Sequence, residues 1–242
     1  MSVPAAFLTA RWEDLALVTW RVPAAMLLSY LPPGLEPDRL PDDPDDVAYV
    51  SFVAFRFLDT KVKGIAVPLH TDFPEVNLRA YVRERDGGRR GVTFIAELVP
   101  KHAIAMVANL VYHEHYRTVP MHCEVVDELD VRRLHMRIEL GGRSHALSIE
   151  GDRATIVPPP DSREAFFKEH EWGFGRDGRG ELVVYRVHHP IWAVYPTDAS
   201  RLSLAVDFAE LYGEPWGYLD QVPPYHVAYA VGSEIAVYPR DS

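Results

Sequence analysis

Alternation of apolar and polar residues dominates this chain, and its clearest case runs from Glu75 to Val82. Every second residue there is apolar, which is the period of a β-strand. The apolar set is Val76, Leu78, Ala80 and Val82, and the opposite set is Glu75, Asn77, Arg79 and Tyr81. One face of this predicted strand belongs to a core, while the other face meets either water or an enclosed pocket.

Similar patterns recur along the chain and predict a protein built mostly of strands. Strands are predicted at 11–22, 47–57, 75–85, 91–98, 181–189, 201–211 and 226–239, with three or four more between 121 and 157. The glycines at 87 and 88 predict a hairpin, and 141–143 and 150–153 are assigned to further hairpin turns. The pattern at 201–211 also fits a helix.

Helical patterns are few. A short apolar helix is expected between Pro23 and Pro32, and residues 101–112 have helical spacing. Another helix is expected to begin at Asp161 or Ser162, either of which can act as N-cap. The acidic, proline-rich stretch 36–46 is a loop. Nothing divides the chain into two cores, so residues 1–242 are predicted to form one mainly β (α+β) domain with two or three helices.

Charge and composition narrow the classes of function. The net charge is -10, and only four of the 25 basic residues are lysines, so the surface should repel phosphate backbones and we expect no nucleic-acid partner. There is no apolar run of about eighteen residues and no basic leader, so neither a membrane span nor a signal peptide is expected. The single cysteine, Cys123, excludes an internal disulfide and fits a cytoplasmic protein.

Standard catalytic motifs are absent from the sequence, including phosphate-binding loops, dinucleotide fingerprints and nucleophile elbows. Cys123 has no local signature of a catalytic thiol, so an inert side chain is expected. His113 and His115 would share one face of an extended segment, but no third ligand is positioned, so we expect no metal and no cofactor; a metal site is the weaker alternative. His189 precedes a strand-ending proline, and it is expected to be buried and hydrogen-bonded with Trp192 packed beside it.

Glu75 and Arg79 raise the question of function most sharply. They lie on one face of the predicted strand but about 13 Å apart, which is too far for a direct ion pair. Each therefore needs its own partner. If the face is enclosed, the partners are a ligand or other buried polar groups; if it is wet, they are cross-strand charges, and the residues alone favour the wet alternative.

Several segments resemble the YqjF-like family of uncharacterised bacterial proteins. The segments are "MLLSYLPPGLEPD", "TDFPEVNLRAYV" followed by "GVTF", "VANLVYHEHYRTVPM", "EAFFKEHEWGF" with "RVHHPIW", and "PPYHVAYAVGSEIAVYP". That family is similar in turn to acetoacetate decarboxylase. The resemblance implies curved antiparallel sheets that form an acetoacetate decarboxylase-like barrel or cavity with peripheral helices. In such a fold the strand that carries Glu75 and Arg79 would line the cavity, which moves the preference to a pocket.

The resemblance also implies a departure in chemistry. Acetoacetate decarboxylase uses a lysine that forms a Schiff base, and Tyr116 falls at that position here, with Asn109 near a conserved arginine. A phenol cannot form an imine, so the decarboxylation route is closed. The set implied to bind a ligand is Glu75, Asn77, Arg79, Asn109, Tyr116, His189 and Trp192, and no residue is assigned as catalytic.

Two functions from different classes follow. The first is a non-enzymatic protein that binds a small oxygenated organic molecule. The alternative is a lyase- or isomerase-type enzyme that acts on a keto or hydroxy acid, with Tyr116, Glu75 or a histidine as acid or base. An interaction module without a ligand is a weaker third, because enclosing Glu75 and Arg79 without partners is costly. Assembly into a homo-oligomer is left open.

Overall fold

The computed structural model describes residues 5–66, 68–101 and 116–239. Its larger sheet contains β1 (Leu8–Pro23), β2 (Leu35–Pro37), β3 (Val47–Val62), β4 (Ile65–Ala66), β5 (Phe73–Glu84), β6 (Arg90–Val99), β7 (Tyr116–Thr118), β11 (Trp172–Arg176), β12 (Leu182–His188) and β14 (His226–Val237). Its smaller sheet contains β8 (Met121–Asp127), β9 (Val131–Leu140), β10 (Arg143–Asp152) and β13 (Leu202–Ala205). The helical elements among these residues are η1 (Ala24–Leu27), α2 (Arg163–Lys168), η2 (Ala199–Arg201), α3 (Phe208–Tyr212) and η3 (Glu214–Gln221).

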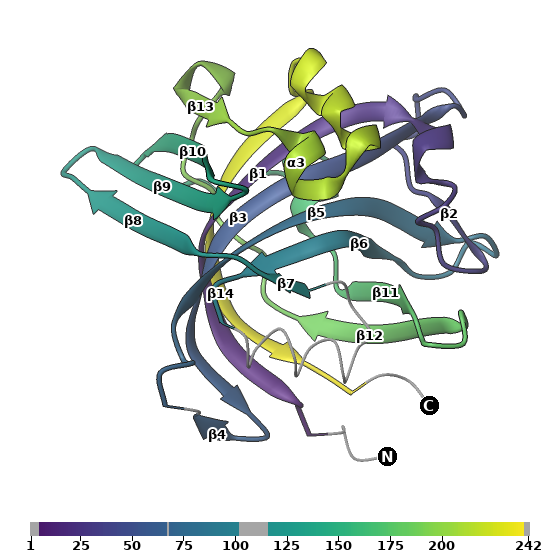
Figure 1. Cartoon of the computed structure of the whole chain (residues 1–242), viewed down its shortest axis with the longest axis horizontal. Coiled ribbons are helices and arrows are strands. Elements are labelled where there is room, and N and C mark those ends of the chain that lie inside the picture. Colours follow the sequence, from purple (N-terminus) through teal and green to yellow (C-terminus); the bar gives the residue numbers. More distant parts are fainter. Residues whose placement is uncertain (1–4, 67, 102–115, 240–242) are drawn as a thin grey trace.

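Pairing of the larger sheet closes on itself. The strand order is β2-β5-β3-β1-β14-β12-β11-β6-β7, with β4 beside β3, and β5 pairs with β6 as well as with β3. The path that leaves β5 through β3 therefore returns to β5 through β6. We call this larger sheet the ring sheet. Its pairs are antiparallel except for β11–β6 and β6–β7 (Figure 1).

The two faces of the ring sheet enter different apolar clusters, because side chains alternate along each strand. The outer face of β5 contributes Val76, Leu78 and Ala80 to a cluster shared with the small sheet, α3 and η3. A second cluster joins Val53 of β3 to Tyr185 of β12, which are not neighbouring strands. Since its members come from opposite sides of the ring, this second face is the inner one.

Most predicted strands are confirmed, as is the hairpin between β5 and β6. The helix expected at Asp161 or Ser162 is α2, and Ser162 is its N-cap, accepting a hydrogen bond from the amide of Ala165. The segment after Pro23 forms only the short 3-10 helix η1, and residues 28–30 form a turn before the proline pair at 32 and 33. The helix expected at 101–112 lies outside the described residues.

Two of the sequence predictions are wrong in detail. Glu150 to Asp152 do not turn but continue β10, pairing with Arg133 to Val131 of β9. Gly151 is there for close packing, because a Cβ atom would lie 2.5 Å from the Cβ of Tyr195. The segment 201–211 is neither one strand nor one helix: it divides into β13 and α3 where Asp207 caps the helix. None of the helices in the described part of the chain is long and apolar enough to cross a membrane.

Candidate functional site

A buried polar set lies on the inner face of the ring sheet, where β5, β6 and β7 run side by side. Glu75 and Asn77 are only 2% and 3% exposed. The side-chain amide of Asn77 donates to Oε1 of Glu75 at 3.1 Å, and the Tyr116 hydroxyl donates to Oε2 at 3.3 Å. The face that carries Glu75 is therefore enclosed, and its carboxylate is held by two neutral donors.

Strand register explains how these groups meet. Asn77 of β5 pairs with Glu97 of β6, and Glu97 in turn pairs with Tyr116 of β7. Glu97 is 2% exposed, so a second carboxylate joins the set. It was not among the residues predicted from sequence, although a lone acidic residue in the apolar run "GVTFIAELV" was a usable signal.

Apolar side chains surround this set. Phe55 and Val53 of β3 lie directly across from Glu75 and Asn77, and both belong to the inner cluster. Such surroundings weaken competition from water and strengthen each polar contact. Tyr212 of α3 belongs to the outer cluster, where burial raises the pKa of its phenol well above the usual value. The charge of Arg117 opposes this rise, and the charges of Glu75 and Glu97 add to it.

Arg79 lies further along β5 and does not pair with Glu75. Its Nη2 donates to the backbone carbonyl of Phe167 at 3.0 Å, and its guanidinium sits 5.5 Å from the centre of the Tyr81 ring. Its Nε is buried and has no hydrogen-bond partner among the described residues. Arg79 is thus held by the segment of α2 through Nη2, while a second buried donor has no hydrogen-bond partner among the described residues.

A chain of hydroxyls also leads to the carbonyl of Phe167. Tyr81 donates its hydrogen to that carbonyl at 3.0 Å, so it accepts from Ser51, and Ser51 accepts from Thr19, each link being 2.6 Å long. Thr19, Ser51 and Tyr81 are fully buried. Together with Arg79 they fasten α2 to the ring sheet.

His189 and Trp192 lie where the sequence predicted. They are 6% and 2% exposed, and their rings stack with centroids 4.1 Å apart. Nδ1 of His189 contacts the carbonyl of Pro190 at 2.9 Å, and Nε2 contacts that of His170 at 3.4 Å. The predicted burial, hydrogen bonding and packing are confirmed; a contact to a ligand stays a prediction.

Two residues of the "FFKEH" segment were not predicted. Burial lowers the pKa of His170 to about 3, with the positive charges of Arg79 and Arg90 acting in the same direction, so its ring is neutral. The Lys168 side chain is 1% exposed and is paired with Glu169, whose carboxylate also accepts from the backbone amide of Trp192 at 3.3 Å. A buried lysine is rare and therefore suggests a functional role. The sequence did not reveal it, because the burial of Lys168 depends on how α2 docks.

The remaining sequence candidates are Asn109, two histidines and the single cysteine. Asn109, His113 and His115 lie outside the described residues. Within the ranges that the structure describes, no three His, Cys, Asp or Glu side chains are grouped so that they could hold a metal ion. Cys123 is half-buried, and burial raises the pKa of its thiol to about 11, which leaves little thiolate at neutral pH.

The fold is that of acetoacetate decarboxylase-like proteins. The enduracididine biosynthesis enzyme MppR complexed with pyruvate has a TM-score of 0.65 at 17% identity, over 100% of this chain and 91% of that one. Acetoacetate decarboxylase from Legionella pneumophila subsp. pneumophila str. Philadelphia 1 has a TM-score of 0.62 at 14% identity, over 98% and 86%. An acetoacetate decarboxylase-like enzyme from Sphingomonas wittichii RW1 has 0.63 at 15%, over 100% and 94%.

At these identities the likeness concerns the fold alone, and it confirms the predicted architecture of curved sheets. The chain belongs to the family DUF2071, described as an uncharacterized conserved protein, whose model matches residues 9–234. The resemblance predicted from the sequence motifs is confirmed. No functionally curated protein matches the chain.

Proposed function

We propose that this protein binds a small oxygenated organic molecule at the inner face of the ring sheet. The observation that carries the proposal is the buried set of Glu75, Asn77 and Tyr116 among apolar side chains. Burying a carboxylate costs several kcal/mol of folding free energy, and the Asn77 amide and the Tyr116 hydroxyl are two of the donors that offset this cost. Such a set is typical of a binding site, where a few polar groups orient a ligand in an apolar pocket.

The ligand class that fits best is a hydroxy or keto acid. Arg79 keeps a free Nε beside a committed Nη2, and its planar guanidinium suits a carboxylate or carbonyl oxygen. Glu75 would accept the hydrogen of a ligand hydroxyl. The MppR enzyme, whose fold is similar, was solved with pyruvate, a keto acid; this support is an analogy of fold.

The test is ligand discovery followed by a variant. Mass spectrometry should identify small molecules retained by the purified protein, and a thermal-shift screen with pyruvate, lactate, acetoacetate and 3-hydroxybutyrate should show a rise in Tm that grows with concentration. We expect Arg79→Ala to abolish this rise. Its ligand-free Tm will change as well, because the contact to Phe167 is lost, so the ligand-induced rise is the criterion.

Arg83→Ala is the matched control. Arg83 has the same parity on β5, but it is part-exposed and paired with Glu36 at 2.7 Å. This variant should respond to the ligand as the native protein does. An equal response from Arg79→Ala would remove Arg79 as the anchor. Failure of every acid, together with no retained molecule, would overturn the proposed function itself.

A second candidate function is acid–base catalysis on such an acid. The specific observation in its favour is the 3.3 Å contact between the Tyr116 hydroxyl and Glu75, two titratable groups within reach of each other. Deuterium uptake from D2O into the methyl group of pyruvate would reveal proton abstraction. Tyr116→Phe should abolish the uptake while pyruvate still raises the Tm. Binding without exchange would favour the non-enzymatic function.

We further propose that no covalent amine takes part. Borohydride added with pyruvate or acetoacetate should leave the protein mass unchanged, because the resemblance to acetoacetate decarboxylase puts the phenol Tyr116 at the position of the Schiff-base lysine. Lys168 is the lysine to examine, since its buried amine lies next to Glu169 and the segment of Trp192. A stable adduct on Lys168 would show that a different lysine has taken over the Schiff base.

A further inference from the structure

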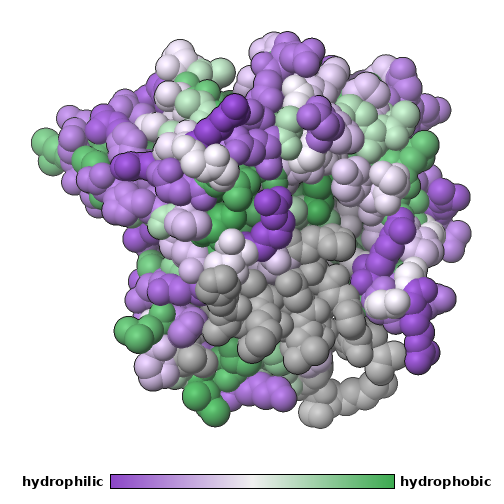
Figure 2. All heavy atoms as spheres, in the orientation of Figure 1, coloured by the Kyte–Doolittle hydropathy of each residue, from purple (hydrophilic) through white to green (hydrophobic). Residues whose placement is uncertain are grey.

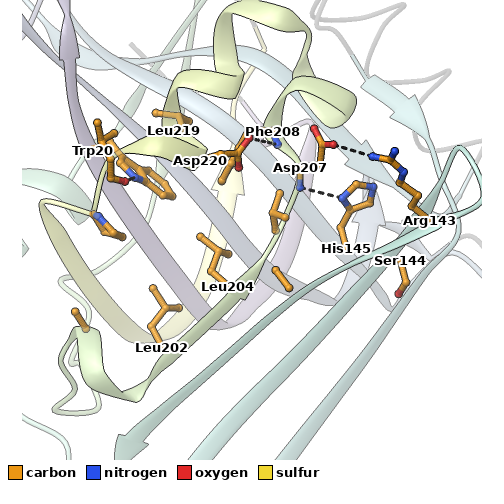
Figure 3. Close-up of a pocket in the computed structure, with 15 residues that line it drawn as sticks. Trp20, Arg143, Ser144, His145, Leu202, Leu204, Asp207, Phe208, Leu219 and Asp220 are labelled. Carbon is orange, nitrogen blue, oxygen red and sulfur yellow. Dashed lines mark hydrogen bonds and ion pairs between the residues drawn. The ribbon is translucent and has the colours of Figure 1, made fainter.

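A separate cleft lies on the outer face of the ring sheet, between the small sheet and the α3–η3 segment. Its volume is about 710 Å³, within the range of small-molecule sites. The residues used below are Trp20, His145, Leu204, Asp207, Phe208 and Asp220, all of which line it (Figure 3). Trp20 and Phe208 belong to the outer cluster, so the cleft shares nothing with the inner face that carries Glu75.

The floor of this cleft is apolar. The rings of Trp20 and Phe208 meet edge to face, 5.2 Å apart, and each residue is 1% exposed. Leu204 belongs to β13, the edge strand of the small sheet, and packs only partly buried against the outer cluster. An apolar body of a ligand would therefore find a preformed surface here.

The rim is acidic. Asp207 and Glu210 share one guanidinium, that of Arg143, at 3.0 and 3.4 Å. Asp220 accepts a hydrogen bond at 3.3 Å from the backbone amide of Phe208. Burial raises the pKa of Asp220, the hydrogen bond from the Phe208 amide lowers it, the charge of Asp207 raises it, and His145 lowers it. Asp207 and Asp220 of the lining, with Glu210 adjoining the cleft, thus lie near one exposed arginine.

His145 does not balance this charge. Its Nδ1 accepts a hydrogen bond from the backbone amide of Asp207 at 3.2 Å, so the ring hydrogen resides on Nε2, which lies 3.6 Å from Glu210. The three carboxylates of Asp207, Glu210 and Asp220 outweigh Arg143 even if this ring adds one positive charge. The rim therefore keeps a net negative charge above an apolar floor.

We propose that this outer cleft is a second binding site, which takes an amphipathic organic cation. The apolar body would lie over Trp20, Phe208 and Leu204, and the ammonium group would contact Asp220. A cation relieves the repulsion between Asp220 and Asp207, whereas an anion would add to it. The net charge of -10 favours the approach of a cation as well.

Three six-carbon probes that differ in their polar group test the proposal: hexylamine, hexanol and hexanoate. Calorimetric titration should show saturable binding of hexylamine, with hexanol and hexanoate at least tenfold weaker. Asp220→Asn should weaken hexylamine at least tenfold and leave hexanol unchanged. Asp86→Asn is the control, because it removes the same charge at an exposed position of the β5–β6 turn.

Leu204→Trp is the second variant, chosen to fill the cleft from β13, and it should abolish hexylamine binding. Circular dichroism and Tm establish that each variant is folded, and if Asp220→Asn does not fold, Leu204→Trp decides alone. Unchanged hexylamine binding by the folded variants would overturn the proposal. Equal affinity for hexanoate would overturn the charge argument. If Arg79→Ala alters hexylamine binding and the cleft variants do not, the amine binds the inner face and the proposal fails.

Discussion

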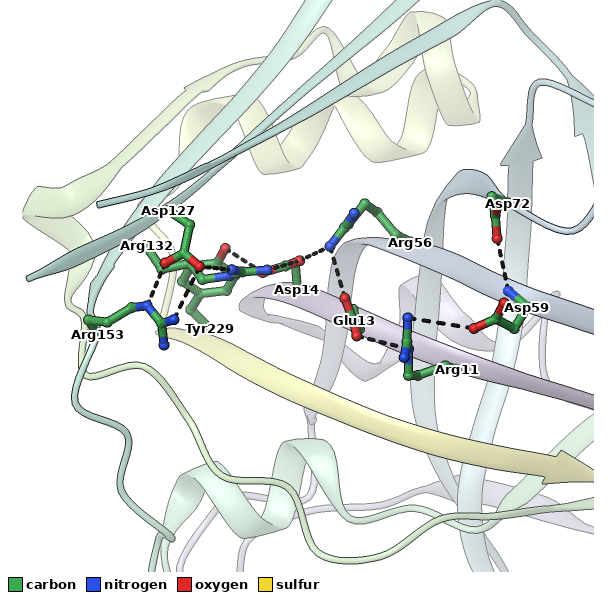
Figure 4. Close-up of polar contacts among 10 residues, drawn as sticks. All are labelled: Arg11, Glu13, Asp14, Arg56, Asp59, Asp72, Asp127, Arg132, Arg153 and Tyr229. Carbon is green, nitrogen blue, oxygen red and sulfur yellow. Dashed lines mark hydrogen bonds and ion pairs between the residues drawn. The ribbon is translucent and has the colours of Figure 1, made fainter. Parts of the chain in front are cut away.

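Asp14 shows how one residue can join several elements. It is fully buried at a β-bulge of β1, with a left-handed backbone φ of 56°. Its carboxylate accepts from Arg56 at 2.5 Å, from Arg132 at 2.7 and 2.9 Å, and from the Tyr229 hydroxyl at 3.0 Å. Figure 4 shows these side chains converging from β3, β9 and β14. Asp14 is therefore a polar connection between the ring sheet and the small sheet.

We expect Asp14→Asn to lower the free energy of unfolding by about 1–3 kcal/mol, because the buried carboxylate that accepts from Arg56, Arg132 and Tyr229 is lost. Arg56 keeps Glu13 as a counter-charge, and Arg132 keeps Asp127. Guanidinium chloride denaturation measures the change. Asp59→Asn is a close control, since Asp59 also has a positive φ, of 54°, but its side chain is 71% exposed. A loss no larger than that of Asp59→Asn would mean that the Asp14 contacts contribute nothing net.

His170 should make stability depend on pH. Burial holds the pKa of His170 at about 3 in the folded protein, against an ordinary value of 6.5. Between pH 6.5 and pH 3 the unfolded chain takes up a proton that the folded chain refuses, so the free energy of unfolding falls as the pH falls. For one such group the slope is at most about 1.4 kcal/mol per pH unit.

Urea denaturation at pH 7, 6 and 5 compares native protein with His170→Gln, which should lose this share of the slope. His226, whose pKa burial also lowers, contributes in the same direction and remains in the variant. His188→Gln is the control, because His188 is 55% exposed and paired with Glu171. Identical slopes for native protein and His170→Gln would contradict the argument.

At the scale of elements, the sequence predicted what depends on local pattern. The period of two located the main strands, and the glycines at 87 and 88 located a hairpin. The sequence prediction failed where a tertiary contact determines the local structure. Gly151 looked like a turn residue, yet it sits inside β10 because Tyr195 packs on it. No local pattern distinguishes a glycine that turns the chain from one that admits a neighbour.

Some features of the candidate site follow from local sequence pattern, and others depend on long-range contacts. That Glu75, Asn77 and Arg79 share a face follows from strand parity alone. That Tyr116 reaches Glu75 depends on the parallel pairing of β6 with β7, and the environment of His170 depends on the docking of α2. Long-range register and docking are not encoded in any short segment, so these contacts could not be predicted from residue patterns.

Contacts at both ends of α2 hold it in place. The Ser162 hydroxyl accepts from the amide of Ala165 at 3.2 Å, and the carbonyl of Phe167 at the other end receives Arg79 and Tyr81. Ser162→Ala should lower the free energy of unfolding by about 1 kcal/mol, within a range of about 0.5–2. Ser203→Ala, at an exposed position of β13, is the control and should change it by less than about 0.5 kcal/mol.

If the site depends on α2, Ser162→Ala should also reduce the rise in Tm caused by any acid that stabilises the native protein. Loss of stability without loss of ligand response would show that α2 is only structural. The ligand-free Tm reports the loss of stability, and the rise in Tm with ligand reports binding. Both come from one thermal-shift plate, so they are compared in one buffer at one protein concentration.

At the scale of the whole molecule, the described residues on the face drawn in Figure 2 are mainly hydrophilic. Figure 2 shows polar side chains gathered over the β8–β9 hairpin, at the left of the view, with apolar patches small and separate on that face. Large exposed apolar side chains are distributed along the chain, from Leu28 to Ile191. With a net charge of -10, the absence of nucleic-acid binding remains our expectation.

The two sheets should unfold as one unit. The outer cluster joins Leu134 and Met136 of β9 to Phe52 of β3, and the Asp14 contacts bridge the same sheets. Removing either sheet would expose the apolar face of the other, so neither should be stable alone. The single domain expected from the sequence leads to the same prediction. It can be tested because the chain carries a different probe in each sheet.

Tryptophan fluorescence reports on the ring sheet and the helical segments, because the five tryptophans, Trp12, Trp20, Trp172, Trp192 and Trp216, all lie outside the small sheet. Cys123, the single cysteine, lies on β8 of the small sheet. Burial raises the pKa of its thiol to about 11, so brief labelling at pH 8 should mark unfolded molecules preferentially. The two probes should give the same midpoint in guanidinium chloride, and Asp14→Asn should lower both midpoints together. Labelling of Cys123 at a denaturant concentration that leaves the fluorescence unchanged would instead show that the small sheet opens independently of the ring sheet.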